Sequence, residues 1–134
     1  MKQLKWHGIV LDLEFNDPKF INQFKIFAKR KSKTNPWTLF GIEIDDNKLE
    51  ESIKGIQNNL KSSQPFYAHL YNDEEIIVVF KEKVIKAQPN KSSWDSIIKY
   101  GRTLTIPEEQ LDFWPNRFQD EIHYFDKEDF IKLI

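Results

Sequence analysis

The chain contains no cysteine and only four glycines among its 134 residues. Without cysteine, disulfide bonds, thiolate metal sites, iron–sulfur clusters and cysteine nucleophiles are all excluded. The four glycines form no Gly-x-Gly-x-x-Gly motif, so a glycine-rich loop that binds a nucleotide or dinucleotide is also excluded. No role that depends on sulfur redox chemistry or on a glycine-rich nucleotide loop remains.

Long hydrophobic runs are also missing. The longest apolar run, Ile76–Phe80, is far shorter than the roughly 20 residues that a membrane-spanning helix needs. The first residues, Met1–His7, lack the apolar segment and cleavage site of a secretory signal. The formal net charge of -1 argues against a dedicated nucleic-acid or membrane-surface binder, because those partners favour strongly basic domains. We expect a cytoplasmic protein with no membrane partner.

The residues that are plentiful are those of a folded globular protein. Hydrophobic residues make up 40% of the chain, charged residues 31% and aromatic residues 14%. This composition is too apolar and too aromatic for a disordered chain, and the length is about that of one domain. We expect a single domain over residues 1–134, with an irregular aromatic-rich segment at about 103–125.

Hydrophobic periodicity predicts a mixture of strands and helices. Apolar residues alternate with polar ones over 8–15 and 37–44, and the Asn72-Asp73 turn predicts a hairpin between 66–71 and 75–80. Helical spacing of apolar residues predicts helices over 18–30, 47–60 and 93–100. The economical arrangement is an α+β fold, a two-layer sandwich in which a mixed, mostly antiparallel sheet carries its helices on one face.

Two pairs of carboxylates follow an alternating spacing, Asp12 with Glu14 and Glu43 with Asp45. Alternate residues of a strand project from the same face, so each pair could share a divalent ion such as magnesium or manganese. If the two strands are neighbours, all four carboxylates form a site of the kind used in two-metal phosphodiester chemistry. The alternative is that they are the solvated half of an alternating strand.

The segment Ile9-Val-Leu-Asp-Leu-Glu14 resembles the first motif of the DEDD-type 3′-to-5′ exonucleases, an apolar strand that ends in Asp-x-Glu. The resemblance covers about one strand. It implies metal-dependent nuclease chemistry at Asp12 and Glu14. The nearest approach to a later motif of that family is His123-Tyr-Phe-Asp126, whose spacing differs from the family pattern.

Aromatic residues suggest two binding surfaces. Tyr67, His69 and Tyr71 share one face of an expected strand, where they line either a ligand pocket or the solvated face of a sheet. Phe113 and Trp114 lie in the irregular segment, where they anchor a protein partner or a second copy of the chain, or close one side of the core.

A basic run, Lys29, Arg30, Lys31 and Lys33, precedes Trp37. Cations beside an aromatic ring are typical of single-stranded nucleic-acid sites. The same cations also complement the dipole at the C-terminus of the helix expected over 18–30, and this second interpretation needs no partner. Nucleic acid is therefore the less favoured partner.

No nucleophile motif or complete metal signature accompanies these features. The sequence favours a non-catalytic binding or protein-interaction module without a cofactor, whose partner is another protein or a second copy of the chain. The alternative is a divalent-metal-dependent phosphodiesterase or nuclease that uses Asp12, Glu14, Glu43 and Asp45.

Overall fold

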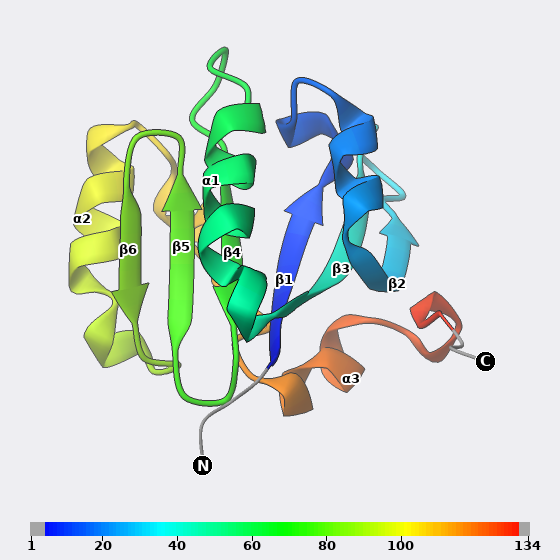
Figure 1. Cartoon of the computed structure of the whole chain (residues 1–134). Helices are drawn as coiled ribbons and strands as arrows, with labels where there is room; N and C mark the ends of the chain where they lie inside the picture. The colour runs from blue at the N-terminus through cyan, green and yellow to red at the C-terminus, as the bar shows by residue number, and fades with distance from the viewer. Residues whose placement is uncertain (1–4, 132–134) are drawn as a thin grey trace.

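A computed structural model describes residues 5–131 of the chain. The fold is built on a six-stranded sheet with the order β2-β3-β1-β4-β5-β6 (Figure 1). Every neighbouring pair of strands is antiparallel. The strands are β1 (Lys5–Leu11), β2 (Lys25–Lys31), β3 (Thr38–Asp45), β4 (Tyr67–Tyr71), β5 (Ile76–Phe80) and β6 (Val84–Ala87).

Helices and single helical turns connect the strands. The α-helices are α1 (Leu49–Asn59), α2 (Asp95–Thr103) and α3 (Glu121–Tyr124). The 3₁₀ turns are η1 (Asp12–Glu14), η2 (Pro18–Gln23), η3 (Asp46–Lys48), η4 (Lys91–Ser93), η5 (Glu108–Gln110), η6 (Phe118–Asp120) and η7 (Lys127–Asp129). The α+β class is confirmed, and so is the predominance of antiparallel pairing in the sheet.

The first face of the sheet is covered by α1 and η2 (Figure 1). Helical spacing places Ile53 and Ile56 of α1 on one stripe, and strand alternation turns Val10, Leu70 and Val79 toward them. These side chains belong to one continuous core cluster, so this face is closed by close packing.

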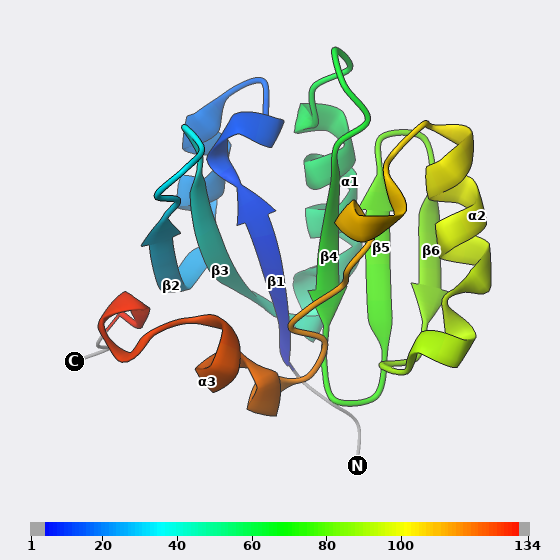
Figure 2. The same ribbon diagram turned by 180° about the vertical axis from the view of Figure 1, so that it is seen from behind.

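The second face carries two separate covers (Figure 2). Near β5 and β6, α2 packs Ile97 against Ile76 and Val78. Near β1 and β2, the C-terminal segment packs Phe125 against Ile9 and Ala28. Helices therefore lie on both faces, where the sequence led us to expect one face, because the residues after β6 cross back over the sheet.

The helix expected over 18–30 is wrong. Its first part is the 3₁₀ turn η2, which begins after the Asp17 side chain accepts a hydrogen bond from the Lys19 backbone N–H at 3.0 Å. Its second part is strand β2, which pairs with β3. A bulge between Ile26 and Ala28 places Phe27 and Ala28 on the same face of the sheet. Two adjacent apolar residues on one face look helical in the sequence, which explains the error.

The strand expected over 8–15 begins and ends earlier than its pattern suggested. β1 starts at Lys5 and ends at Leu11, and Asp12–Glu14 turn away as η1. Asp12 ends the strand by accepting a hydrogen bond from the Thr38 backbone N–H at 2.9 Å. Asp12 and Glu14 therefore do not project together from one strand face.

Candidate functional site

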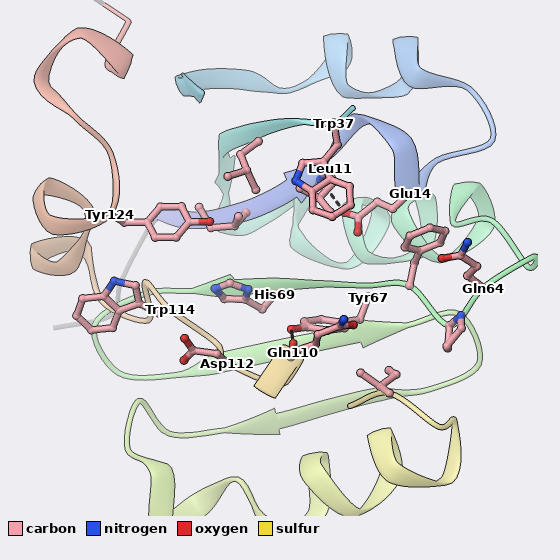
Figure 3. Close-up of a pocket in the computed structure, with 15 residues that line it drawn as sticks. Leu11, Glu14, Trp37, Gln64, Tyr67, His69, Gln110, Asp112, Trp114 and Tyr124 are labelled. Atoms are coloured by element: carbon pink, nitrogen blue, oxygen red, sulfur yellow. Dashed lines mark hydrogen bonds between the residues drawn. The ribbon is translucent and has the colours of Figure 1, made fainter. Parts of the chain in front are cut away.

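A pocket opens on the second face of the sheet, between the α2 cover and the C-terminal cover (Figure 3). Its volume is about 430 Å³, within the range of small-molecule sites. The floor comes from β1, β3 and β4, and the walls come from η1, the loop before β4, the segment after α2, and α3. The lining residues are Ile9, Leu11, Glu14, Trp37, Leu39, Gln64, Pro65, Phe66, Tyr67, His69, Ile106, Gln110, Asp112, Trp114 and Tyr124.

Aromatic rings supply much of the wall. Figure 3 shows Trp114 and Tyr124 at one end of the pocket and Trp37 and Tyr67 nearer its middle. Trp114 is 37% exposed, which is unusual for a large apolar side chain. Rings arranged around a hollow offer large contact area to a flat apolar ligand.

His69 is a buried, neutral histidine on the pocket floor. It is 5% exposed, and its Nε2 atom lies 2.8 Å from the carbonyl oxygen of Pro115. Since a carbonyl can only accept, Nε2 carries the proton and donates it. Burial lowers the pKa of His69 to about 4, against the opposing effect of the Pro115 hydrogen bond. At neutral pH, Nδ1 is therefore a bare acceptor.

That acceptor is free for a ligand. Within residues 5–131, Nδ1 of His69 has no hydrogen-bond partner. The atom nevertheless keeps some contact with solvent, because it is not one of the fully buried polar atoms that lack a partner. Because His69 lines the pocket, the opening that reaches Nδ1 is the pocket itself.

Glu14 is the second buried titratable group of the pocket, and it is 2% exposed. Its Oε1 atom accepts a hydrogen bond from the Leu11 backbone N–H at 3.0 Å. Burial raises the pKa of Glu14 well above its usual value, and the nearby Asp12 adds to this, although the Leu11 hydrogen bond opposes it. In the part of the chain that is described, the Oε2 atom of Glu14 has no hydrogen-bond partner and keeps some contact with solvent.

Tyr67 lies on the same face of β4 as His69. Its hydroxyl donates to the Gln110 carbonyl oxygen, which ties η5 to the pocket. Burial raises the pKa of Tyr67, and the negative charges of Glu14 and Asp112 raise it further. Both carboxyl groups therefore make the electrostatic potential around the Tyr67 hydroxyl more negative.

The lining residues carry charge of one sign. Glu14 and Asp112 are the acidic ones, and no lysine or arginine is among the fifteen residues drawn in Figure 3. Arg30 is a cation in contact with a lining residue, and its Cζ lies 4.9 Å from the Tyr124 ring centre. Its Nη1 donates to the Tyr124 carbonyl oxygen at 2.5 Å, which holds the guanidinium beside α3.

Only some of the predicted binding residues line the pocket. Tyr67, His69 and Trp114 meet in the pocket. Phe113 is fully buried in the cluster beneath α2, where it contacts the Trp94 ring. Tyr71 is fully buried and donates its hydroxyl hydrogen bond to Glu121.

The four predicted metal ligands are not brought together. In the β1–β3 register Leu11 pairs with Leu39, whereas Glu43 and Asp45 pair with His7 and Lys5 at the opposite end. Asp12 and Glu14 follow Leu11, so the two carboxylate pairs lie at opposite ends of these strands. Across residues 5–131, no group of three or more His, Asp or Glu side chains is arranged to hold a metal ion.

The basic run also takes a different form. Lys29, Arg30 and Lys31 are on strand β2, so alternation turns Arg30 toward the second face and its two neighbours toward the first. Lys33 lies in the loop before β3. The run is therefore split between two faces and does not form the continuous cationic helix end that its sequence suggested.

Sequence reasoning missed a second polar cluster on the second face, which we call the His7 network. The His7 ring lies between two carboxylates, with Nδ1 2.5 Å from Glu121 and Nε2 3.1 Å from Glu43. Tyr71 donates to Glu121, and Lys25 lies 3.1 Å from Glu43. Burial acts to raise the pKa of Glu43, but hydrogen bonds from His7 and Lys25 outweigh it and lower the pKa. No local sequence motif predicts this network, because Glu121 lies in the irregular segment, far from His7 in the sequence.

The comparisons with known proteins add no further evidence. No helix of the described residues is long and apolar enough to cross a membrane. A scan against protein-family models, a search of curated proteins and a search of solved structures each found no match to this chain.

Proposed function

We propose that this protein is a non-catalytic binding module that holds a small, flat, largely apolar molecule in the pocket on the second face of its sheet. The observation that carries this proposal is the pocket's free acceptors. Glu14 and His69 are almost completely buried, yet each turns an unpaired acceptor atom toward an aromatic-lined hollow. Buried polar groups are normally paired within the protein, so unpaired acceptors on buried side chains that line one pocket are typical of a ligand site.

The shape of the pocket supports the same function. The convergence of aromatic rings with a few polar atoms is the usual composition of a small-molecule site. The rings come from four separate parts of the chain, around Trp37, Tyr67, Trp114 and Tyr124. Their positions are fixed by the sheet and by the two covers, so the pocket is formed before a ligand arrives.

The other predictions are less well supported by the geometry. The alternative of a metal-dependent phosphodiesterase has no assembled carboxylate site, because the two pairs lie at opposite ends of β1 and β3. The cytoplasmic location, and a protein partner or second copy of the chain, stay predictions from the sequence.

Calorimetric titration with 2-(2-naphthyl)ethanol tests the proposal, because this probe has a flat ring system and one hydroxyl. We expect a Kd of about 1 mM or tighter for the wild type, as the efficiency of drug-sized ligands implies. Trp114→Ala removes one wall and should weaken binding at least several-fold. Ile122→Ala is the matched control, because Ile122 is 70% exposed and does not line the pocket.

The proposal fails if the wild type binds neither this probe nor its charged analogues at millimolar concentration. It also fails if Trp114→Ala, with an unchanged circular dichroism spectrum, binds as tightly as the wild type. Equal weakening in Ile122→Ala would likewise show that the probe binds elsewhere.

A further inference from the structure

We propose that the ligand of this pocket is a protonated primary or secondary amine carried on a flat apolar body. This inference rests on the proposed function and adds the chemical class of the ligand. It follows from the unpaired acceptors of Glu14 and His69 and from the sign of the charge on the lining residues.

Two of the lining side chains that are almost completely buried, Glu14 and His69, each leave an acceptor atom unpaired. Nδ1 of His69 has no proton to give while Nε2 donates to Pro115, and Oε2 of Glu14 has no partner among the residues that the structure describes. A ligand that expels water without supplying a donor leaves these buried atoms unpaired, which is costly. An ammonium group has two or three N–H donors and no acceptor, so it can pair with the ionised Glu14 carboxylate.

The charges favour a cation as well. Glu14 and Asp112 line the pocket, and no basic side chain does. The faces of Trp37 and Trp114 also attract cations, because aromatic rings carry negative charge on their faces. An anionic ligand would lose its water shell and gain no counter-ion, which is strongly unfavourable.

The same charges orient the ligand. Arg30 lies over Tyr124, so this end of the pocket repels a second cation. Glu14 and Asp112 both act on the Tyr67 hydroxyl, which makes the region beside Tyr67 the most negative. The amine therefore lies toward Glu14 and Tyr67, and the apolar body extends toward Trp114 and Tyr124.

Glu14 links amine binding to pH. Its raised pKa means that the empty pocket holds a proton there at higher pH than usual, and an adjacent ammonium favours the ionised carboxylate. Glu14 interacts with Asp12 on η1 and with Tyr67 on β4, and the pocket lining also carries the titratable side chains of His69, Asp112 and Tyr124. Amine binding thus releases a proton from Glu14, and the affinity should rise with pH until Glu14 is ionised in the empty protein.

A matched set of three probes tests the class of ligand. Calorimetric titrations at pH 7 compare 2-(2-naphthyl)ethylamine, 2-(2-naphthyl)ethanol and 2-naphthylacetate, which share one ring system and differ in charge. We expect the amine to bind at least about tenfold more tightly than the alcohol, since it adds charged hydrogen bonds. The carboxylate should bind most weakly. The trimethylated ammonium analogue keeps the charge without N–H donors and should bind more weakly than the amine.

Glu14→Gln is the first variant to test. It should remove most of the preference for the amine over the alcohol, and it should remove the rise of amine affinity with pH. Glu82→Gln is the charge-matched control, because Glu82 is an exposed carboxylate in the β5–β6 turn, away from the pocket. Asp112→Asn is a second variant, at an exposed position where a substitution should not disturb folding. It should weaken binding of the amine and leave binding of the alcohol unchanged.

The outcomes separate the two proposals. Equal binding of amine and alcohol, or tightest binding of the carboxylate, overturns the amine assignment and leaves the binding pocket standing. An amine preference that survives in both Glu14→Gln and Asp112→Asn also overturns it. Failure of every probe to bind overturns the proposed function itself.

Discussion

The second face of the sheet carries two polar clusters that differ in whether their atoms are paired. In the His7 network, His7 contacts Glu43 and Glu121, and Glu121 also accepts a hydrogen bond from Tyr71. In the pocket, Glu14 and His69 each use one polar atom within the protein and leave the other open. Paired atoms of this kind hold segments together, whereas unpaired buried acceptors weaken the empty protein and serve only when something binds.

The two clusters also join the same pieces of chain. Glu121 begins α3, and Tyr124, three residues later, closes one end of the pocket. The His7 network therefore holds in place a wall that the pocket uses. This comparison predicts that substitutions in the His7 network act on stability, and that substitutions in the pocket act mainly on binding.

The largest expected effect is that of His7→Ala. The His7 side chain is 15% exposed, and its ring also lies 4.1 Å from the Phe27 ring. Its removal takes away the ring contact with Phe27 and the hydrogen bonds that the ring makes to Glu43 and Glu121, which should together cost about 3 to 5 kcal/mol in the free energy of unfolding. Urea denaturation measures the loss, and His123→Ala on the exposed side of α3 is the control. A loss below about 1 kcal/mol would show that the network is not structural.

A pH effect of the next size should come from His69. Burial lowers its pKa in the folded protein from 6.5 to about 4, so the unfolded chain takes up a proton first as the pH falls. Stability is therefore fully present above pH 6.5 and is lost as the pH falls toward 4, by roughly 3 kcal/mol in all.

Urea denaturation of the wild type and of His69→Gln between pH 7.5 and pH 4 measures this effect. Glutamine can still donate to the Pro115 carbonyl but does not titrate, so its curve should be flatter over this range. Parallel curves for the two proteins would contradict the assignment of a neutral, buried His69.

The sequence predicted those parts of the fold whose structure is set by residues close together in the chain. Asn72 makes the β4–β5 turn, because its Oδ1 atom accepts from the Glu74 and Glu75 backbone N–H groups at 2.9 and 2.8 Å. Helix α1 follows the spacing of Ile53 and Ile56. Tyr67 and His69 were placed on one strand face by simple alternation, and this face became the floor of the pocket.

The remainder depended on contacts between distant segments. The 18–30 pattern fits a helix, but β3 supplies a pairing partner that turns 25–31 into a strand. Trp37, Trp114 and Tyr124 become neighbours only because the chain after β6 recrosses the sheet. The sequence predicted Glu14 as a metal ligand. Its burial in the pocket wall depends on distant segments and cannot be predicted from the sequence pattern.

The smallest expected effects come from a matched pair on β4, Tyr71→Phe and Tyr67→Phe. Both changes delete one hydroxyl from the same strand face, but Tyr71 donates to the Glu121 carboxylate in the His7 network and Tyr67 donates to the Gln110 carbonyl beside the pocket. Hydrogen bonds to charged groups contribute more, so we expect losses of about 2 kcal/mol for Tyr71→Phe and about 1 kcal/mol for Tyr67→Phe in urea denaturation. Equal losses, or a larger loss for Tyr67→Phe, would mean that the two clusters do not differ as their pairing implies. The predicted order would show that the hydroxyl paired with a carboxylate in the His7 network contributes more to stability than the hydroxyl paired with a backbone carbonyl beside the pocket.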